Sequence, residues 1–167
     1  LRCAREGTVS ADGVREMAGL LAQAGADSIG LSDTTGYANP AQIKRMFRRL
    51  RSEIGAEKMA GAHLQNTRGQ GLANVVAALE VDVTTFDSSL GGLGGCPYAP
   101  GATGNIVTED LVFMLEAMGL HTGVDIEALI VAREVLLRGL PDAAIYGNLP
   151  EVGLPKGFTY ANEKGAR

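Results

Sequence analysis

A strand-like segment followed by a helix-like segment occurs three times in this sequence of 167 residues. Short apolar runs at 26–33, 58–64 and 83–87 are typical of buried strands, and each precedes a longer stretch with helical spacing of its apolar residues. Strands that alternate with helices form parallel sheets, because a long crossover is needed to return the chain to the same end of the sheet. The repetition predicts an α/β fold and leaves both an open sheet and a closed barrel possible.

Helix starts and apolar faces follow from the same pattern. Ser10, Thr108 and Asp125 are expected to cap helices. The first helix should bury Val14, Met17, Ala18 and Leu21. A second helix should begin at Pro40 and bury Ile43, Met46, Phe47, Leu50 and Ile54. Because Gly and Pro are frequent from Pro141 onward, we expect a surface coil there, and divide the chain into a domain at 1–140 and a tail at 141–167.

The composition argues against several classes of function. A net charge of −4 and an apolar content of 46% indicate a globular protein that does not bind nucleic acid. No apolar run approaches the ~20 residues of a membrane-spanning helix. The first residues lack the apolar core of a signal peptide, and Cys3 and Cys96 have no CxxC spacing. We expect a cytoplasmic protein with reduced cysteines.

Polar side chains end all three predicted strands: Asp33, His63 and Asp87. Ligands of parallel α/β proteins bind at this carboxyl edge, which makes it the expected site. The last strand leads into a loop at 91–105 with six glycines, Cys96 and Asn105. Glycines allow positive φ angles and close approach to a ligand, and a cysteine in such a loop is a candidate for proton transfer or nucleophilic attack.

Three segments resemble the hydroxymethylglutaryl-CoA lyase family in order and spacing. They are Asp-Thr-Thr-Gly at 33–36, His-Leu-Gln-Asn-Thr-Arg-Gly at 63–69 and the very specific Gly-Gly-Cys-Pro-Tyr at 94–98. The resemblance implies a (β/α)8 TIM barrel, of which this chain carries strands 6–8. The Arg-Asp-Gly motif that the family has on its first strand does not occur in the sequence. We therefore expect the C-terminal part of a longer enzyme, inactive alone and dimeric when full length.

The resemblance also implies an activity. Such a lyase cleaves 3-hydroxy-3-methylglutaryl-CoA to acetyl-CoA and acetoacetate, a step of leucine degradation and ketone body metabolism, with a divalent cation, Mg²⁺ or Mn²⁺. The substrate partner is an acyl-CoA. The implied residues are His63, Gln65 and Asn105 for the metal, Cys96, His63 and Asp33 for catalysis, and Thr67, Gly94 and Gly95 for substrate binding.

Gln65 departs from the family pattern, which commonly has a second histidine there. An amide oxygen is a weaker ligand than imidazole for transition metals but is acceptable to Mg²⁺. The change leaves open weaker metal binding, a preference for Mg²⁺, or another substrate such as citramalyl-CoA. A condensing enzyme and a non-catalytic fragment are further alternatives.

Each candidate residue also has a structural interpretation. Asp33 could cap a turn, His63 could be satisfied by a buried hydrogen bond, and Cys96 could be an inert buried thiol. The basic cluster at 44–51 is expected to be a solvated helix face, with contact to CoA phosphates as the lesser possibility.

Overall fold

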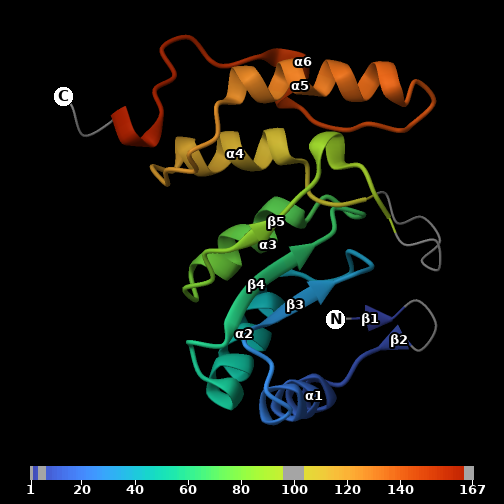
Figure 1. The fold of residues 1–167 in the computed structure, drawn as a ribbon, viewed down its shortest axis with the longest axis vertical. Helices are drawn as coiled ribbons and strands as arrows, with labels where there is room; N and C mark the ends of the chain where they lie inside the picture. Colours follow the sequence, from blue (N-terminus) through green and yellow to red (C-terminus); the bar gives the residue numbers. More distant parts are fainter. Residues whose placement is uncertain (1, 4–6, 96–103, 164–167) are drawn as a thin grey trace. The chain divides into compact units, whose positions relative to one another are not determined.

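The computed structural model describes the chain except residues 1, 4–6, 96–103 and 164–167 (Figure 1). It divides into two compact units, a first unit of Leu1–Asp87 with Gly94–Asn105 and a second unit of Ser88–Leu93 with Ile106–Arg167. Within the described part, no helix combines the length and the apolar character needed to cross a membrane.

The first unit is built on a parallel sheet of three strands, β3 (Ile29–Asp33), β4 (Met59–Leu64) and β5 (Phe86–Asp87). Their order in the sheet is their order in the sequence. Because crossovers between parallel strands are right-handed, an order without reversal places the intervening helices on one face, as in a barrel. A doubly wound sheet instead reverses at its switch point. The predicted three parallel strands are confirmed, and their order favours the barrel.

Helices α2 (Pro40–Ile54) and α3 (Gly71–Leu79) follow β3 and β4 and contact β4 and each other, on one side of the sheet (Figure 1). Asn39 caps α2 in a reciprocal pair with Gln42, and Pro40 occupies the first turn. The predicted inward face of α2 is buried in full: Ile43, Met46, Phe47, Leu50 and Ile54.

Alternation along the strands separates the two faces of the sheet. On β3, Leu31 and Asp33 are buried while Ser32 is exposed. On β4, Leu64 is buried while His63 is half-buried. Successive strand residues point to opposite faces, so Ser32 and His63 lie on the face away from α2 and α3. That face of the strands is where the candidate site begins.

Helix α1 (Ala11–Gln23) begins at the predicted cap, Ser10, but its apolar face is only partly buried. Ala18 is buried, whereas Met17 is 58% and Leu21 45% exposed. Both exposed side chains line an apolar groove beside β3. β3 is the edge of the described sheet, so no neighbouring strand and helix in the described residues cover this groove. The prediction for Met17 and Leu21 is therefore wrong for this structure.

The first unit also contains two short strands before α1, and its third parallel strand is shorter than expected. β1 (Arg2–Cys3) and β2 (Gly7–Thr8) form a short antiparallel pair before α1. The third predicted strand is shorter than expected, because β5 includes only the last two residues of 83–87. Val83 is buried without belonging to a strand, directly after Asp82, which adopts a φ of 61°.

The second unit is helical. It contains a 3₁₀ turn, η1 (Leu90–Gly92), and the helices α4 (Thr108–Ala117) and α5 (Ile126–Gly139). Asp125 caps α5 as predicted, accepting from the N–H of Ala128 at 3.0 Å. Thr108 does not cap α4: it is the first helical residue, and its hydroxyl lies 2.8 Å from that of Ser88.

The C-terminal segment packs against these helices instead of forming only a surface coil. It includes α6 (Leu149–Val152) and η2 (Ala161–Glu163). Leu149 joins Val112 of α4 and Ile126 of α5 in a buried cluster, with Phe158 and Tyr160 packed against it. The second unit thus has its own apolar core.

A buried ion pair anchors η1 within the second unit. Glu109 is fully buried, and its Oε1 lies 2.7 Å from Nη1 of Arg133. The N–H of Gly91 donates to both carboxylate oxygens of Glu109, at 3.1 and 3.0 Å. Gly91 adopts a φ of 62°, and an added Cβ there would collide with Ile145. This arrangement fixes the backbone of η1 within the second unit.

Candidate active site

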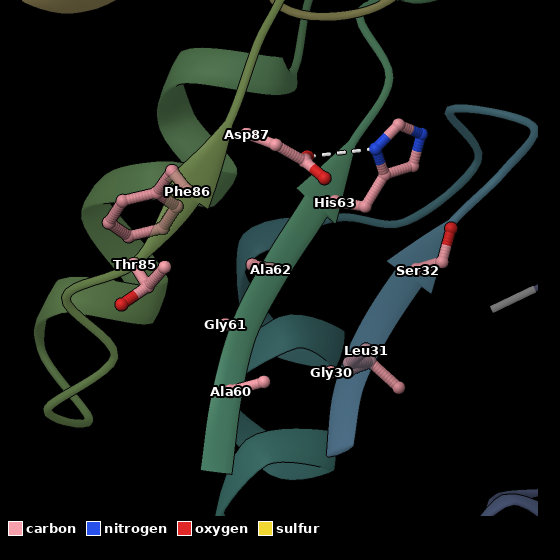
Figure 2. A pocket seen from close by; sticks show the side chains of 10 residues that line it. All are labelled: Gly30, Leu31, Ser32, Ala60, Gly61, Ala62, His63, Thr85, Phe86 and Asp87. Atoms are coloured by element: carbon pink, nitrogen blue, oxygen red, sulfur yellow. Dashed lines mark hydrogen bonds and ion pairs between the residues drawn. The ribbon is translucent and has the colours of Figure 1, made fainter. Parts of the chain in front are cut away.

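Two predicted residues meet at the carboxyl ends of β4 and β5. Nδ1 of His63 lies 2.8 Å from Oδ1 of Asp87, and both side chains line an open pocket on the face of the sheet away from α2 and α3 (Figure 2). Ser32 of β3 lines the same pocket. In the neutral ring, a carboxylate at Nδ1 selects the tautomer with the proton on Nδ1, so that Nε2 carries a lone pair. His63 is thus arranged as a ligand or a base.

Gln65 and Asn105 form a second pair just beyond the end of β4. Nε2 of Gln65 donates to Oδ1 of Asn105 at 3.1 Å, and the two residues form an antiparallel bridge. Next to it, the N–H of Asn66 donates to the carbonyl of Gly104 at 3.0 Å. These contacts tie the end of the glycine-rich loop to the residues that follow His63.

The other oxygen of Gln65 is unusual. Gln65 is 5% exposed, and its Oε1 is buried without a hydrogen-bond partner among the described residues. A buried polar atom left without a partner is costly, and native structures usually satisfy it with water, an ion or a ligand. Gln65 directly follows the last residue of β4 and comes two residues after His63 in the sequence. The orphaned oxygen is therefore a reason to expect a ligand near the end of β4.

The donor set fits a hard cation. Within the described residues, no three His, Cys, Asp or Glu side chains are grouped to hold a metal ion. The candidate donors are instead the imidazole Nε2 of His63 and the amide oxygens of Gln65 and Asn105, of which the Asn105 oxygen already accepts from Gln65. Mg²⁺ prefers oxygen ligands and keeps part of its water shell, which suits a site with few protein donors.

Asp33 is placed differently from these residues. It is buried, and its two carboxylate oxygens accept from the N–H groups of Tyr37 at 3.2 Å and Ala38 at 3.0 Å. Burial raises the pKa of Asp33, while these two backbone N–H groups and the charge of Arg68 act in the opposite direction. In this structure, Asp33 organises the turn after β3.

Thr67 and Gly94 lie close to the Gln65 and Asn105 region. The hydroxyl of Thr67 is buried without a hydrogen-bond partner in the described part of the chain. Gly94 has a φ of 121°, and a Cβ there would lie 2.9 Å from Nδ2 of Asn105. Gly95 has a φ of 158°. Cys96, the predicted catalytic thiol, lies outside the described residues.

Two features of this site were not predicted. The contact of Asp87 with His63 was not predicted, although the equal positions of both residues at the ends of adjacent strands are a signal that could have indicated the pair. The guanidinium of Arg68 lies over the ring of Tyr37, with Cζ 3.7 Å from the ring centroid. No sequence pattern marks that contact, because the two residues are on different loops.

The chain matches one protein family over most of its length. The HMGL-like family profile covers residues 1–136. Mouse mitochondrial hydroxymethylglutaryl-CoA lyase is 44% identical over 140 residues, which are 84% of this chain and 43% of the mouse protein. Hydroxymethylglutaryl-CoA lyase YngG of Bacillus subtilis is 45% identical over 130 residues, 78% of this chain and 43% of that protein. A rat relative at 40% identity is named cytoplasmic.

Solved structures give the same result for the fold. An HMG-CoA lyase from Acinetobacter baumannii, in complex with coenzyme A and 3-methylmalate, superposes with a TM-score of 0.87 at 43% identity, covering 95% of this chain and 51% of that one. The Bacillus subtilis HMG-CoA lyase superposes with a TM-score of 0.83. These neighbours are TIM barrels, and the chain spans less than half the length of the curated relatives. The specific loops, the uninterrupted parallel strand order and the family match lead to one conclusion: this chain belongs to the HMGL-like family of carbon–carbon lyases.

Proposed function

We propose that this chain is the C-terminal part of a hydroxymethylglutaryl-CoA lyase. The whole enzyme cleaves 3-hydroxy-3-methylglutaryl-CoA to acetyl-CoA and acetoacetate. One observation carries the proposal: His63, oriented by Asp87, lies at the carboxyl edge of the sheet, two residues before Gln65 with its orphaned oxygen. The relatives at 43–45% identity are named hydroxymethylglutaryl-CoA or HMG-CoA lyases, which supports 3-hydroxy-3-methylglutaryl-CoA as the substrate.

The residues of this chain divide the work of a retro-Claisen cleavage. A base takes the proton of the tertiary hydroxyl, whose electron pair forms the new carbonyl of acetoacetate at C3. The bond between C2 and C3 breaks, and its electron pair forms the enolate of acetyl-CoA. His63, Gln65 and Asn105 would hold a divalent cation, which when bound supplies the positive charge that acidifies the substrate hydroxyl. Asp87 keeps His63 in the orientation and tautomer that this role requires.

Cys96 is proposed to deliver the proton that converts the enolate to acetyl-CoA. The described residues on either side of its loop support this role. Gly94, Gly95 and Gly104 have φ angles of 121°, 158° and 119°, a backbone path that L side chains rarely adopt. Such a path lets the loop approach a substrate closely. Gly94, Gly95 and Thr67 are proposed to contact that substrate.

The remaining barrel strands are proposed to come from a segment that precedes Leu1 in the full-length protein. The chain spans about half of the solved lyases it resembles. It also lacks the Arg-Asp-Gly motif that the family resemblance leads us to expect on the first strand. We propose that this preceding segment supplies the motif, and that the full-length enzyme is a homodimer.

The test is an assay of the full-length gene product. With Mg²⁺ or Mn²⁺ present, we expect acetoacetate to form from 3-hydroxy-3-methylglutaryl-CoA, and citramalyl-CoA to react far more slowly. Cys96→Ala should lower kcat by about two to four orders of magnitude, the usual contribution of a proton-transfer group, while CoA affinity stays within about twofold. Absence of acetoacetate from a correctly folded full-length protein would refute the proposal.

A further inference from the structure

The loops after β3 and β4 carry a pair of side chains that the proposed chemistry does not use. Tyr37 is half-buried and Arg68 is exposed, and Cζ of Arg68 lies 3.7 Å from the centroid of the Tyr37 ring. A guanidinium over an aromatic face is attracted by the ring quadrupole. The contact therefore restricts a long cationic side chain that would otherwise sample many rotamers.

The backbones that carry the pair are braced against each other. Asp33 accepts from the N–H of Tyr37, which fixes the turn after β3. Gly36 in that turn has a φ of 62°, and a Cβ there would lie 2.8 Å from both Cβ and Oγ1 of Thr67. The two loops are thus in direct contact immediately before Tyr37 and Arg68. The position of the guanidinium is set by the fold as well as by the stack.

Among the described residues, no carboxylate lies within ion-pair distance of the Arg68 guanidinium, and its charge acts on the carboxylate of buried Asp33 only from beyond that distance. The basic face of α2 is different, since three of its members form ion pairs: Lys44 with Glu80, Arg49 with Asp12, and Arg51 with Asp82. Arg68 therefore combines a fixed position with an available charge, and the stack leaves its N–H groups free to bind an anion in the ring plane.

The loop of Arg68 leaves the sheet at the carboxyl end of β4, three residues after Gln65. An acyl-CoA that enters this edge carries phosphates on its nucleotide, and its acyl group carries a carboxylate. We infer that Arg68, held in place by Tyr37, is an anion-binding residue for the acyl-CoA substrate. The inference rests on the proposed function. It adds a residue that recognises the substrate and that is neither a proposed metal ligand nor the proposed catalytic cysteine.

The test compares Arg68→Gln with Arg138→Gln in the full-length protein. Arg138 is an exposed arginine of α5 and serves as the matched control. Loss of one charge-assisted contact should raise KM for 3-hydroxy-3-methylglutaryl-CoA by roughly ten- to a hundredfold, with kcat within about twofold. Arg138→Gln should leave both constants unchanged. Arg68→Lys should retain part of the affinity, and Tyr37→Leu should lose part of it.

A second arm identifies the anion. The same acyl group is presented on pantetheine, which lacks the nucleotide phosphates, and CoA alone is titrated by calorimetry. If Arg68 binds a phosphate, Arg68→Gln weakens CoA binding and leaves KM for the pantetheine thioester unchanged. If it binds the acyl carboxylate, the variant raises that KM and leaves CoA binding unchanged. Either pattern supports the inference.

Unchanged binding of CoA and of both thioesters in Arg68→Gln would overturn the inference and leave the stack as a purely structural contact. Melting curves establish whether Arg68→Gln is folded. If Arg68→Gln does not fold, Arg68→Lys, which retains the charge, is measured in its place. The proposed function can fail separately. If the wild-type protein turns over no substrate, titrations with CoA and with 3-hydroxy-3-methylglutaryl-CoA still measure the contribution of Arg68.

Discussion

His63 and Asp87 are direct neighbours in the parallel register of β4 and β5, and Nδ1 of the histidine lies 2.8 Å from Oδ1 of the aspartate. Asp87, the last residue of β5, therefore orients His63 near the end of the neighbouring strand β4. Because the imidazole ring is already oriented, binding of a ligand at Nε2 costs less rotational entropy of the side chain. The pairing of two strands thus determines which nitrogen is available for chemistry.

Removal of this carboxylate should weaken metal binding. We expect Asp87→Ala to lower the affinity of the full-length protein for Mg²⁺ or Mn²⁺ by about 10- to 100-fold, because His63 loses the partner that fixes its tautomer and orientation. Metal titration by calorimetry measures the change. Asp82→Ala, which removes an exposed carboxylate paired with Arg51, is the control and should have no effect. Equal affinities for both variants would contradict the orienting role.

Gln65 should determine which metal is preferred. We expect Gln65→His to raise Mn²⁺ affinity by about tenfold or more and to change Mg²⁺ affinity much less, since imidazole is the better ligand for transition metals. Gln65→Leu should weaken binding of both, because it removes the orphaned Oε1. Competition titrations with the two cations distinguish these cases. If Gln65→His leaves Mn²⁺ affinity unchanged, residue 65 is not a ligand.

The parallel sheet and the packing of α2 could be predicted because they depend on local periodicity. The five apolar residues of α2 recur at helical spacing, and all five are buried. The same reasoning is wrong for Met17 and Leu21, since periodicity identifies an apolar face but not what covers it. The cap prediction, which rests on residue preference at helix starts, is wrong for Thr108, whose hydroxyl contacts Ser88 instead of capping α4.

The composition of the candidate site was less predictable than the fold. His63 and Gln65 could be identified from their place at a strand end and from the family resemblance. The contact of Tyr37 with Arg68 could not, because it joins two loops whose conformations depend on tertiary contacts. Asp87 was identified as a residue of the site edge, but its partner follows only from the register of β4 and β5.

The carboxylate of Glu116 should make the free energy of unfolding fall as the pH becomes acidic. It is fully buried and accepts from the N–H and hydroxyl of Thr122 and from the N–H of Ala161. Burial alone would raise the pKa of Glu116, but these hydrogen bonds and nearby His121 outweigh it and lower the pKa from its ordinary 4.5. A depressed folded-state pKa adds stability above the unfolded-state value, and this stability is lost as the pH falls through the folded-state value.

Urea unfolding at a series of pH values tests this dependence. Between about pH 5 and 3, the free energy of unfolding should fall less steeply in Glu116→Gln than in the wild type, because one linked proton is removed. Glu151→Gln provides a control on an exposed carboxylate of α6. If the wild type and Glu116→Gln have parallel pH profiles, the carboxylate does not contribute the predicted linkage.

Removing one partner of the buried ion pair of Glu109 and Arg133 should lower the free energy of unfolding more than replacing both partners with apolar residues. Glu109→Ala leaves the guanidinium buried without its partner and removes the acceptor for the N–H of Gly91, so we expect a loss of about 3–5 kcal/mol in the free energy of unfolding. The double variant Glu109→Leu with Arg133→Met should recover much of that loss, since it leaves no unpaired charge. Glu134→Ala, which breaks an exposed pair with Arg138, should cost at most about 0.5 kcal/mol. Chemical denaturation of all three variants measures these differences, and a Glu109→Ala cost close to that of Glu134→Ala would show that the pair does not anchor η1.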